Sequence, residues 1–278
     1  MKNSLLYLTM IGAALAAFSC SKEINDPDET FAQTGKDAVA EEVTFTLSVP
    51  ESEDTKTTLG SKTGTSYPVL WSSGDVITLN GTAATSFTPE SGNASAKATF
   101  KLANLSAPYN FLYGGVSGQS AQVTFPATQN YVAGGFDPAA LPMYASLASR
   151  SDNVVFSHLA ALLKFSITGS KKIDSVSLAA ADENQSLSGN FTIGTTSGLL
   201  DGSLTPVATG AGLIYGFGGH IQLSTTPFEF FIAVPAGTYE GGITLTIVDN
   251  DSGSMAVKVL DTDATRSEEH TSELQSPQ

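Results

Sequence analysis

The sequence is short of cysteine and of basic residues. Only one cysteine, Cys20, occurs among 278 residues, so the chain cannot close an internal disulfide and must be stabilised by a packed core. Lysine and arginine number 13 against 27 aspartates and glutamates, which gives a net charge of −14. Nucleic-acid binding needs clustered cations against phosphate. We therefore predict that nucleic acid is not a partner.

Helical periodicity is also scarce. After an N-terminal apolar run, no amphipathic pattern of ten or more residues occurs, and charged residues make up only 14% of the chain. Glycine, serine, threonine and alanine are abundant, as is typical of extracellular β-proteins. Short alternating segments separated by turn residues indicate sandwiches or barrels. The sequence therefore predicts an all-β fold.

The residue constellations of common enzymes are missing as well. His158, His220 and His270 have no other histidine or cysteine at metal-ligand spacing, and no G-x-S-x-G motif occurs. The segment Asp249–Gly253 has the composition of a turn and lacks the glutamate that a calcium loop needs. Asp75 has no partner carboxylate for glycoside hydrolysis. We predict no catalytic residue, no metal and no cofactor, and hence no enzymatic activity.

The N-terminus has the pattern of an export signal. Lys2 is followed by the apolar run Leu5–Phe18 and then by Cys20. As a helix this run would reach about 20 Å, which is too short to cross a bilayer core of about 30 Å. We interpret residues 1–19 as a bacterial lipoprotein signal peptide and Cys20 as the lipidated N-terminus. The alternative is an ordinary signal peptide that leaves Cys20 as a spare thiol.

The signal is followed by a tether and a first strand. Residues 20–41 are acidic and poor in large apolar side chains, which predicts a flexible tether. Apolar and polar residues then alternate strictly over Val43–Val49, the pattern of a half-buried strand. The polar stretch 51–66 that follows contains Lys56 and Lys62.

Further strands are predicted by the same alternation, and Tyr67–Leu79 is predicted to be a hairpin around a Ser-Gly-Asp turn. Trp71 in that hairpin is either a core residue or, if exposed, a surface for stacking on a sugar ring. Leu159–Leu163 fits either one helical turn or the start of a long strand. The other expected strands are Ala98–Leu102, Tyr109–Tyr113, Gln122–Phe125, Met143–Ala145, Val154–Phe156, Leu187–Ile193, Phe228–Val234, Ile243–Val248 and Met255–Leu260.

The last residues differ from the rest. Residues 266–278 show a sudden rise in charge and closely resemble the translation of a common sequencing adapter. We interpret them as a non-native tail and exclude them from the predicted fold. The natural protein is then expected to continue beyond Thr265, with one or more C-terminal strands missing here.

Four segments together resemble the fimbrillin-like (Mfa-like) surface lipoproteins of Bacteroidetes. They are the lipoprotein signal at Cys20, Trp71–Ile77, Phe156–Phe165 and Phe231–Tyr239. The resemblance implies two tandem transthyretin-like β-sandwich domains, 42–150 and 151–265, the second incomplete at its C-terminus.

The resemblance also implies a function. It is that of a lipid-anchored fimbrial (pilus) subunit or adhesin on the outer membrane, which assembles by β-strand donation. Its partners would be other fimbrial subunits, the outer membrane through the lipid, and a host or bacterial surface receptor. Lys56 and Lys62 are the candidate processing positions, because no arginine precedes Arg150.

The alternative function is a surface glycan-binding lipoprotein. It would require exposed aromatic side chains in a row on a sheet. The candidates for such a row are Tyr109, Tyr113, Tyr131 and Tyr215.

Overall fold

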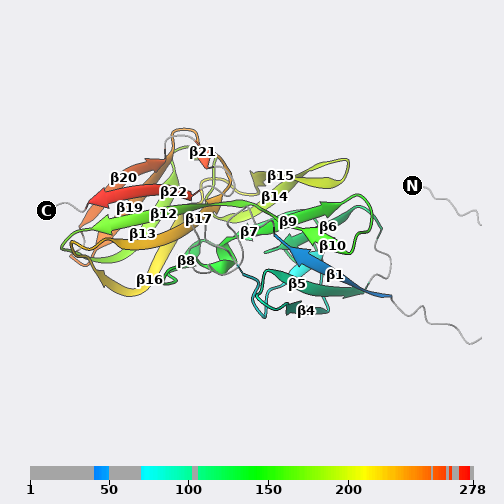
Figure 1. The fold of residues 1–278 in the computed structure, drawn as a ribbon. Coiled ribbons are helices and arrows are strands. Elements are labelled where there is room, and N and C mark those ends of the chain that lie inside the picture. Colours follow the sequence, from blue (N-terminus) through cyan, green and yellow to red (C-terminus); the bar gives the residue numbers. More distant parts are fainter. Residues whose placement is uncertain are drawn as a thin grey trace, which may run out of the picture. The chain divides into compact units, whose positions relative to one another are not determined.

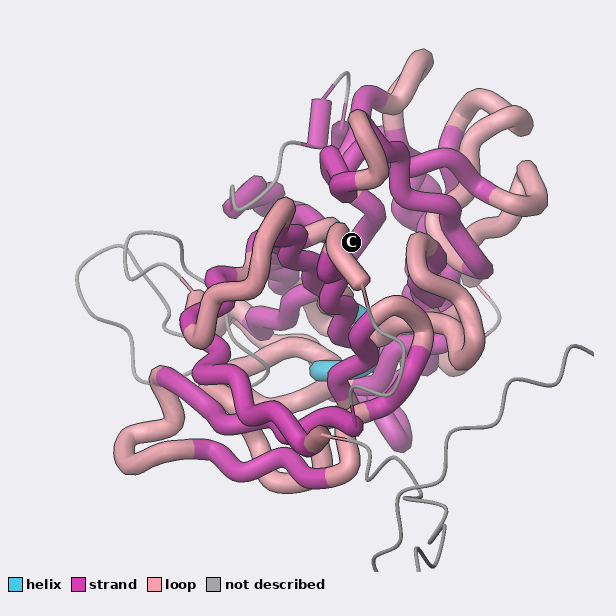
Figure 2. The backbone as a smooth tube through the Cα atoms, turned by 90° about the vertical axis from the view of Figure 1, so that its right-hand side faces the viewer, coloured by secondary structure: helices cyan, strands magenta, loops and turns pink. Residues whose placement is uncertain are grey.

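The alternating segments form the strands of stacked sheets. The computed structural model describes residues 41–49, 70–101, 106–251, 253–260, 263–264 and 269–275. Strands predominate in these residues, and the one helical element among them is a short 3₁₀ turn, η1 (Pro138–Ala140) (Figures 1 and 2). The predicted all-β class is confirmed. In the described part of the chain, no helix is both long and apolar enough to cross a membrane.

Two sheets enclose the core of the first sandwich. Their strand orders are β10-β1-β5-β4 and β11-β9-β6-β2-β3. The strands are β1 (Glu42–Ser48), β2 (Ile77–Leu79), β3 (Thr82–Ala83), β4 (Ser86–Pro89), β5 (Ser95–Lys101), β6 (Tyr109–Tyr113), β9 (Met143–Leu147), β10 (Asn153–Val155) and β11 (Ser157–His158). Side chains from both sheets form one buried cluster, in which Phe45, Phe111 and Trp71 are fully buried.

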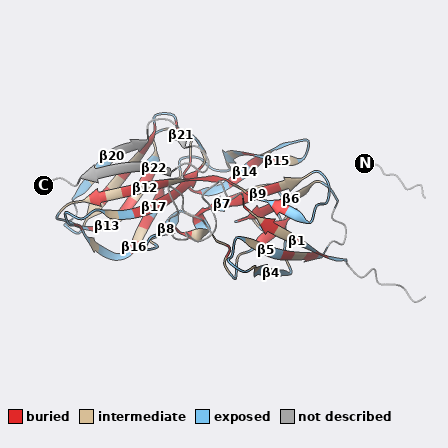
Figure 3. Cartoon of the chain, viewed as in Figure 1, coloured by how far each residue is buried: buried red, intermediate tan, exposed pale blue. Residues whose placement is uncertain are grey.

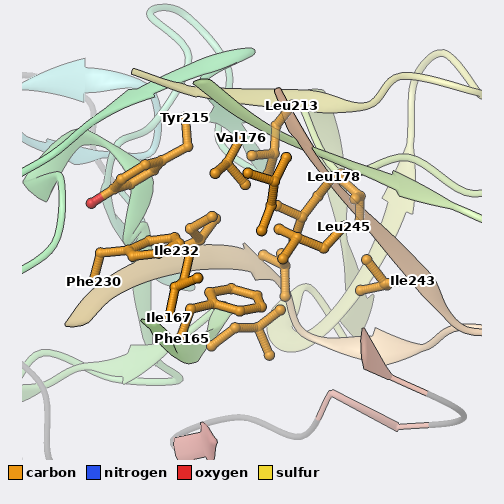
Figure 4. Packing of buried hydrophobic residues seen from close by; sticks show 14 of the residues in the cluster. Phe165, Ile167, Val176, Leu178, Leu213, Tyr215, Phe230, Ile232, Ile243 and Leu245 are labelled. Carbon is orange, nitrogen blue, oxygen red and sulfur yellow. The ribbon is translucent and has the colours of Figure 1, made fainter. Parts of the chain in front are cut away.

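Two further sheets enclose the core of the second sandwich. Their orders are β17-β12-β22 and β20-β19-β13-β16-β8. The strands are β8 (Thr128–Asn130), β12 (Ala160–Thr168), β13 (Lys172–Ala180), β16 (Leu213–Gln222), β17 (Phe228–Pro235), β19 (Ile243–Asp249), β20 (Ser254–Leu260) and β22 (Glu269–Gln275). Figure 4 shows its core, where Phe165, Phe230 and Tyr215 lie together with aliphatic side chains of β13 and β19. Buried positions alternate with more exposed ones along β12 and β19, whereas β17 is buried throughout Phe230–Pro235 (Figure 3).

Smaller elements connect the two sandwiches. A sheet of order β15-β14-β7 joins β7 (Gln122–Phe125) to β14 (Gly189–Thr196) and β15 (Leu199–Pro206). Its apolar side chains form a third buried cluster with residues from both halves of the sequence. The pair β18 (Gly237–Thr238) and β21 (Asp263–Ala264) completes the described strands. The sandwiches belong to a single compact unit, Ala40–Gln278.

Strand pairing crosses residue 150 in both directions. β10 lies after that residue and pairs with β1, whereas β7 and β8 lie before it and pair with β14 and β16. The division into domains 42–150 and 151–265 therefore stays a prediction.

Three local expectations can be compared with the structure. Leu159–Leu163 belongs mostly to β12 and not to a helical turn. The predicted Ser-Gly-Asp turn is present, with the Asp75 amide donating to the Ser72 carbonyl over 3.2 Å. The described part of the first hairpin arm is not a strand, because the Trp71 amide instead donates to the carbonyl of Asn93 at 2.9 Å.

The C-terminal tail also differs from its expectation. Residues 266–278 were predicted to lie outside the fold, but Glu269–Gln275 is strand β22, which pairs in parallel with β12. The open edge of β12 on the side away from β17 accounts for this, because an unpaired row of main-chain donors and acceptors binds an available segment. The adapter origin of the tail stays a prediction.

Candidate functional site: the first strand and its two neighbours

Strand β1 is an interior strand of its sheet. It pairs antiparallel with β5 over its full length, from Glu42 opposite Lys101 to Ser48 opposite Ser95. On its other side it pairs in parallel with β10, with Leu47 in register with Val154. The strand therefore has main-chain partners along both edges, and its removal would leave a slot between β5 and β10.

The inner face of β1 is deeply buried. Phe45 and Leu47 have no exposed surface, and Val43 and Val49 are each 4% exposed. The Phe45 ring meets Phe111 edge-on at a centroid distance of 5.0 Å and Phe100 at 6.0 Å. Such edge-to-face pairs add about 0.5–1.5 kcal/mol each beyond the burial of area.

The outer face of β1 is held weakly. The hydroxyls of Thr44 and Thr99 share a hydrogen bond of 2.8 Å at an exposed position. Glu42 and Lys101 form a surface ion pair at 4.0 Å, and surface pairs of this kind stabilise little. The retention of β1 therefore depends on its inner face and on the main-chain ladder.

Three predicted site residues fall outside the described part of the chain. They are the lipidation candidate Cys20 and the processing candidates Lys56 and Lys62. The described chain stops at Val49 and resumes at Leu70, so the segment that carries both lysines directly follows β1.

The aromatic candidates do not form an exposed row. Trp71 has no exposed surface and contacts Phe156 and Tyr113 edge-on, so it is a core residue. Tyr113 and Tyr215 are buried, and Tyr109 and Tyr131 are half-buried.

The charged and histidine candidates have structural partners. Nδ1 of His220 contacts Asp174 at the surface. Asp249 Oδ1 accepts the amides of Asp251 and Gly253 at 3.0 and 2.7 Å, which closes the predicted turn. Asp251 accepts a hydrogen bond from Lys171 and thereby raises the pKa of that lysine. Among the described residues, no three or more His, Cys, Asp or Glu side chains are grouped to hold a metal.

A hollow lies beside the Ser-Gly-Asp turn. It has a volume of about 440 Å³ and is lined by Asp75, Val76, Tyr113, Thr124 and other residues. The Tyr113 hydroxyl donates to Asp75 Oδ1 over 3.3 Å, and burial followed by the nearby Asp75 charge raises the pKa of Tyr113. The described lining of this hollow contains one carboxylate, Asp75, so it does not offer the pair of carboxylates that glycoside hydrolysis uses.

Sequence reasoning missed the parallel partner of β1. Val154 and Phe156 were assigned to a strand, but nothing in that segment indicated that it would pair with a strand more than 100 residues earlier. Both side chains are fully buried beside β1, and the Phe156 amide donates to the Ser48 carbonyl at 2.8 Å. Alternation identifies a buried face but not the neighbouring strand.

The fold and this site define a class: an all-β sandwich protein whose N-terminal strand is inserted between two others. No protein-family model matches the sequence, and no curated protein matches it.

Solved structures similar to this chain come from Bacteroidales. A candidate cell adhesion protein of Bacteroides ovatus matches with a TM-score of 0.43 and 11% identity, covering 75% of this chain and 85% of that chain. The tip fimbrial protein Mfa3 of Porphyromonas gingivalis, with a C-terminal truncation, matches with a TM-score of 0.41 and 9% identity, covering 85% and 95%. A candidate cell adhesion protein of Bacteroides thetaiotaomicron has a TM-score of 0.35 and 12% identity, covering 84% and 93%. At these levels the matches carry no argument about activity.

Proposed function

We propose that this chain is a surface-exposed fimbrial subunit or adhesin that is anchored in the outer membrane through a lipid on Cys20. It assembles when its first strand is removed, together with the lipid-bearing segment that precedes it, and a strand of another subunit takes the vacated place. Its partners are other fimbrial subunits and a receptor on a host or bacterial surface. The family resemblance of the sequence motifs and the position of β1 support this proposal.

The observation that carries the proposal is the insertion of β1 between β5 and β10. Loss of this strand would uncover the positions of Val43, Phe45, Leu47 and Val49 in the core. Burial of each such side chain contributes about 1.5–3 kcal/mol, so a replacement strand would recover about 6–12 kcal/mol before the cost of ordering it. Strand addition also restores two main-chain ladders.

Processing would occur in the segment after β1. A lysine-specific endoprotease that cuts at Lys56 or Lys62 would separate β1 covalently from the rest of the first sandwich, because β1 ends at Ser48. Only the non-covalent contacts described above would then retain it.

The test is limited digestion of the full chain with a lysine-specific endoprotease. We expect cleavage at Lys56 or Lys62, loss of the N-terminal fragment, and a ladder of oligomers that resists mild denaturant. The variant Lys56→Gln/Lys62→Gln is the matched control, and it should stay intact in this segment and monomeric. A product that has lost β1 and is still monomeric at high concentration would exclude strand exchange.

The glycan-binding alternative now depends on the hollow that Asp75 and Tyr113 line. The exposed aromatic row that it required is not formed by Tyr109, Tyr113, Tyr131 and Tyr215. Binding of an oligosaccharide that is lost in Asp75→Ala, together with monomeric behaviour after loss of β1, would favour this alternative.

A further inference from the structure

Large and small side chains oppose each other across β1 and β5 on the inner face of their sheet. The pairs in register are Val43 with Phe100, Phe45 with Ala98 and Leu47 with Ala96. All six side chains are buried, and the two alanines have no exposed surface. Directly opposed side chains of an antiparallel pair have Cβ atoms about 4.5–5.5 Å apart, so the size of one limits the size of the other. The phenylalanine of β5 therefore leaves room for a valine, and its alanines leave room for larger residues.

The place that Phe45 occupies has the width of an aromatic ring. Its ring meets those of Phe111 and Phe100 edge-on, at centroid distances of 5.0 and 6.0 Å. On the β10 side, the register extended by one residue brings Asp152 level with Phe45, and Asp152 is exposed. Small Ala98 on one side and an exposed residue on the other therefore leave space for the ring in the core.

The place that Leu47 occupies is narrower. Leu47 is in register with Ala96 on β5 and with Val154 on β10, and both neighbours are fully buried. A valine is stiff about χ1, so Val154 gives way less readily than an unbranched side chain would. A phenylalanine in place of Leu47 would be crowded against Val154, whereas the leucine fits between the two strands.

We infer that Ala96, Ala98 and Val154 select the strand of another subunit that replaces β1. The incoming strand carries an aromatic ring beside Ala98 and a leucine-sized aliphatic side chain between Ala96 and Val154. Beside Phe100 it carries a residue no larger than valine. This inference rests on the proposed function and states which donor strand fits the vacated place. The sizes of the side chains at these levels, and not their summed hydrophobicity, determine the fit.

The first test exchanges two residues within the intact chain, with no protease. Phe45→Leu/Leu47→Phe keeps the composition of β1, but it leaves one place partly empty and overfills the other. The equilibrium constant for unfolding should rise at least about thirtyfold in urea titration. Thr46→Ser/Ser48→Thr is the matched control on the outer face of the same strand, and it should change the constant by less than about threefold. Equal effects of the two exchanges overturn the inference.

A further variant tests whether Val154 limits the size of the residue beside it. Val154→Ala should destabilise the unchanged chain but restore part of the stability of Leu47→Phe, because it makes room for the ring. Opposite signs in the two backgrounds identify a direct contact. Val123→Ala, at a fully buried position of another cluster, is the control and should destabilise both backgrounds equally. If Val154→Ala also costs the same in both, the inference is wrong.

The second test offers labelled peptides to the full chain after its cleavage by the lysine-specific endoprotease. The reference peptide copies residues 42–49, Glu-Val-Thr-Phe-Thr-Leu-Ser-Val, and the test peptide has phenylalanine in place of the leucine. The test peptide is the more apolar, so non-selective binding would favour it, but we expect it to bind at least about tenfold more weakly. A peptide with methionine in place of the leucine has a similar volume and should bind like the reference. Equal or tighter binding of the phenylalanine peptide, or binding of neither peptide, overturns the inference.

The outcomes separate this inference from the proposed function. Oligomers that form from the cleaved chain although the two peptides bind equally would support strand exchange and overturn the selection by side-chain size. Selective peptide binding by a cleaved chain that stays monomeric would support the selection and contradict the proposed assembly.

Discussion

The side-chain amide of Gln129 pairs with the main chain of Ala233 as if it were a neighbouring strand. Its Nε2 donates to the Ala233 carbonyl at 2.6 Å, and the Ala233 amide donates to its Oε1 at 3.0 Å. Both residues are fully buried. Ala233 lies on β17, an edge strand of its sheet, whereas Gln129 lies on β8 of the facing sheet. One side chain therefore satisfies a buried edge and links two sheets.

Because of this pair of hydrogen bonds, a substitution that conserves the shape of Gln129 should still lower the free energy of unfolding strongly. Gln129→Met would leave the amide and the carbonyl of Ala233 buried without these partners, and each orphaned group costs about 1–3 kcal/mol. We expect the free energy of unfolding to fall by about 2–6 kcal/mol in urea titration. Gln119→Met, at an exposed position, is the matched control and should change it by less than about 0.5 kcal/mol. Equal effects of the two changes would show that the pair contributes nothing.

The alternation of apolar and polar residues predicted which side chains of a strand are buried. It did not predict which strands pair with one another. Val43–Val49 was assigned to a half-buried strand, and the structure places all four of its apolar residues in the core. The pairing of β7 and β8 with the second sandwich could not be foreseen, because contacts between distant segments depend on the assembled core.

The predictions for Trp71 and for the C-terminal tail were wrong for a similar reason. Trp71 was expected in a strand because of its apolar neighbours, but its backbone bonds to a turn residue, Asn93, while its ring fills the core. The tail strand β22 has a polar sequence and is specified by the open edge of β12 rather than by its own residues. A candidate site made of main-chain edges has no sequence motif, so the sequence predicted the first strand but not the two strands that flank it.

A polar network joins the β14–β15 hairpin to the first sandwich. Asn110 Nδ2 donates to the Gly198 carbonyl at 3.1 Å, and the Leu200 amide donates to Ser146 Oγ at 2.9 Å. Ser146 Oγ in turn donates to Asn110 Oδ1. Asn110 is 7% exposed, so its loss would leave several of these groups short of partners.

Asn110→Ala should therefore loosen this hairpin. We expect a loss of about 1–3 kcal/mol in the free energy of unfolding. Hydrogen exchange at the Leu200 amide should accelerate more than exchange in β19, which lies outside the network. Asn184→Ala, at an exposed turn, is the control. Uniform acceleration across both sandwiches would mean that Asn110 stabilises the whole unit rather than the hairpin.

Alkaline pH should destabilise the protein through its buried tyrosines. Burial is the main cause that raises the pKa of Tyr113, Tyr215 and Tyr239 above the ordinary value near 10. Above that pH the unfolded state loses protons that the folded state keeps, so the free energy of unfolding falls as the pH rises. The slope reaches at most about 1.4 kcal/mol per pH unit for each tyrosine.

Spectroscopic titration would test this pH dependence. Of the eight tyrosines in the chain, these three should ionise only when the near-ultraviolet circular dichroism collapses. Tyr239→Phe should lower the slope of stability against pH above 10, although it also loses the 2.5 Å hydrogen bond from the hydroxyl to the Pro235 carbonyl. Ionisation of all eight tyrosines in the folded protein would contradict the prediction.

Lipid anchoring at Cys20 is a separate prediction. Each buried CH₂ of an acyl chain contributes about 0.8 kcal/mol, so two or three chains suffice for stable anchoring. Cys20→Ser should abolish labelling by a fatty-acid probe and move the protein out of the detergent phase. Ser21→Ala is the control and should keep both properties. Equal labelling of the two variants would exclude Cys20 as the modified residue.

Retention of the first strand should depend most on Phe45. Its ring is fully buried and meets both Phe100 and Phe111, so Phe45→Ala would open a cavity at the centre of the first sandwich. Truncation of a buried phenylalanine costs about 3–5 kcal/mol. Thr44→Ala changes the exposed face of the same strand and should cost less than about 1 kcal/mol, because it removes only a surface hydrogen bond.

Trp71 emission reports this difference, because no other tryptophan is present and its ring lies in the same cluster. In urea titration the Phe45→Ala midpoint should fall well below that of Thr44→Ala. After cleavage at Lys56 or Lys62, the N-terminal fragment should also dissociate faster from Phe45→Ala. If the two variants release the fragment at the same rate, the inner face does not retain β1, and the ladder with β5 and β10 must do so.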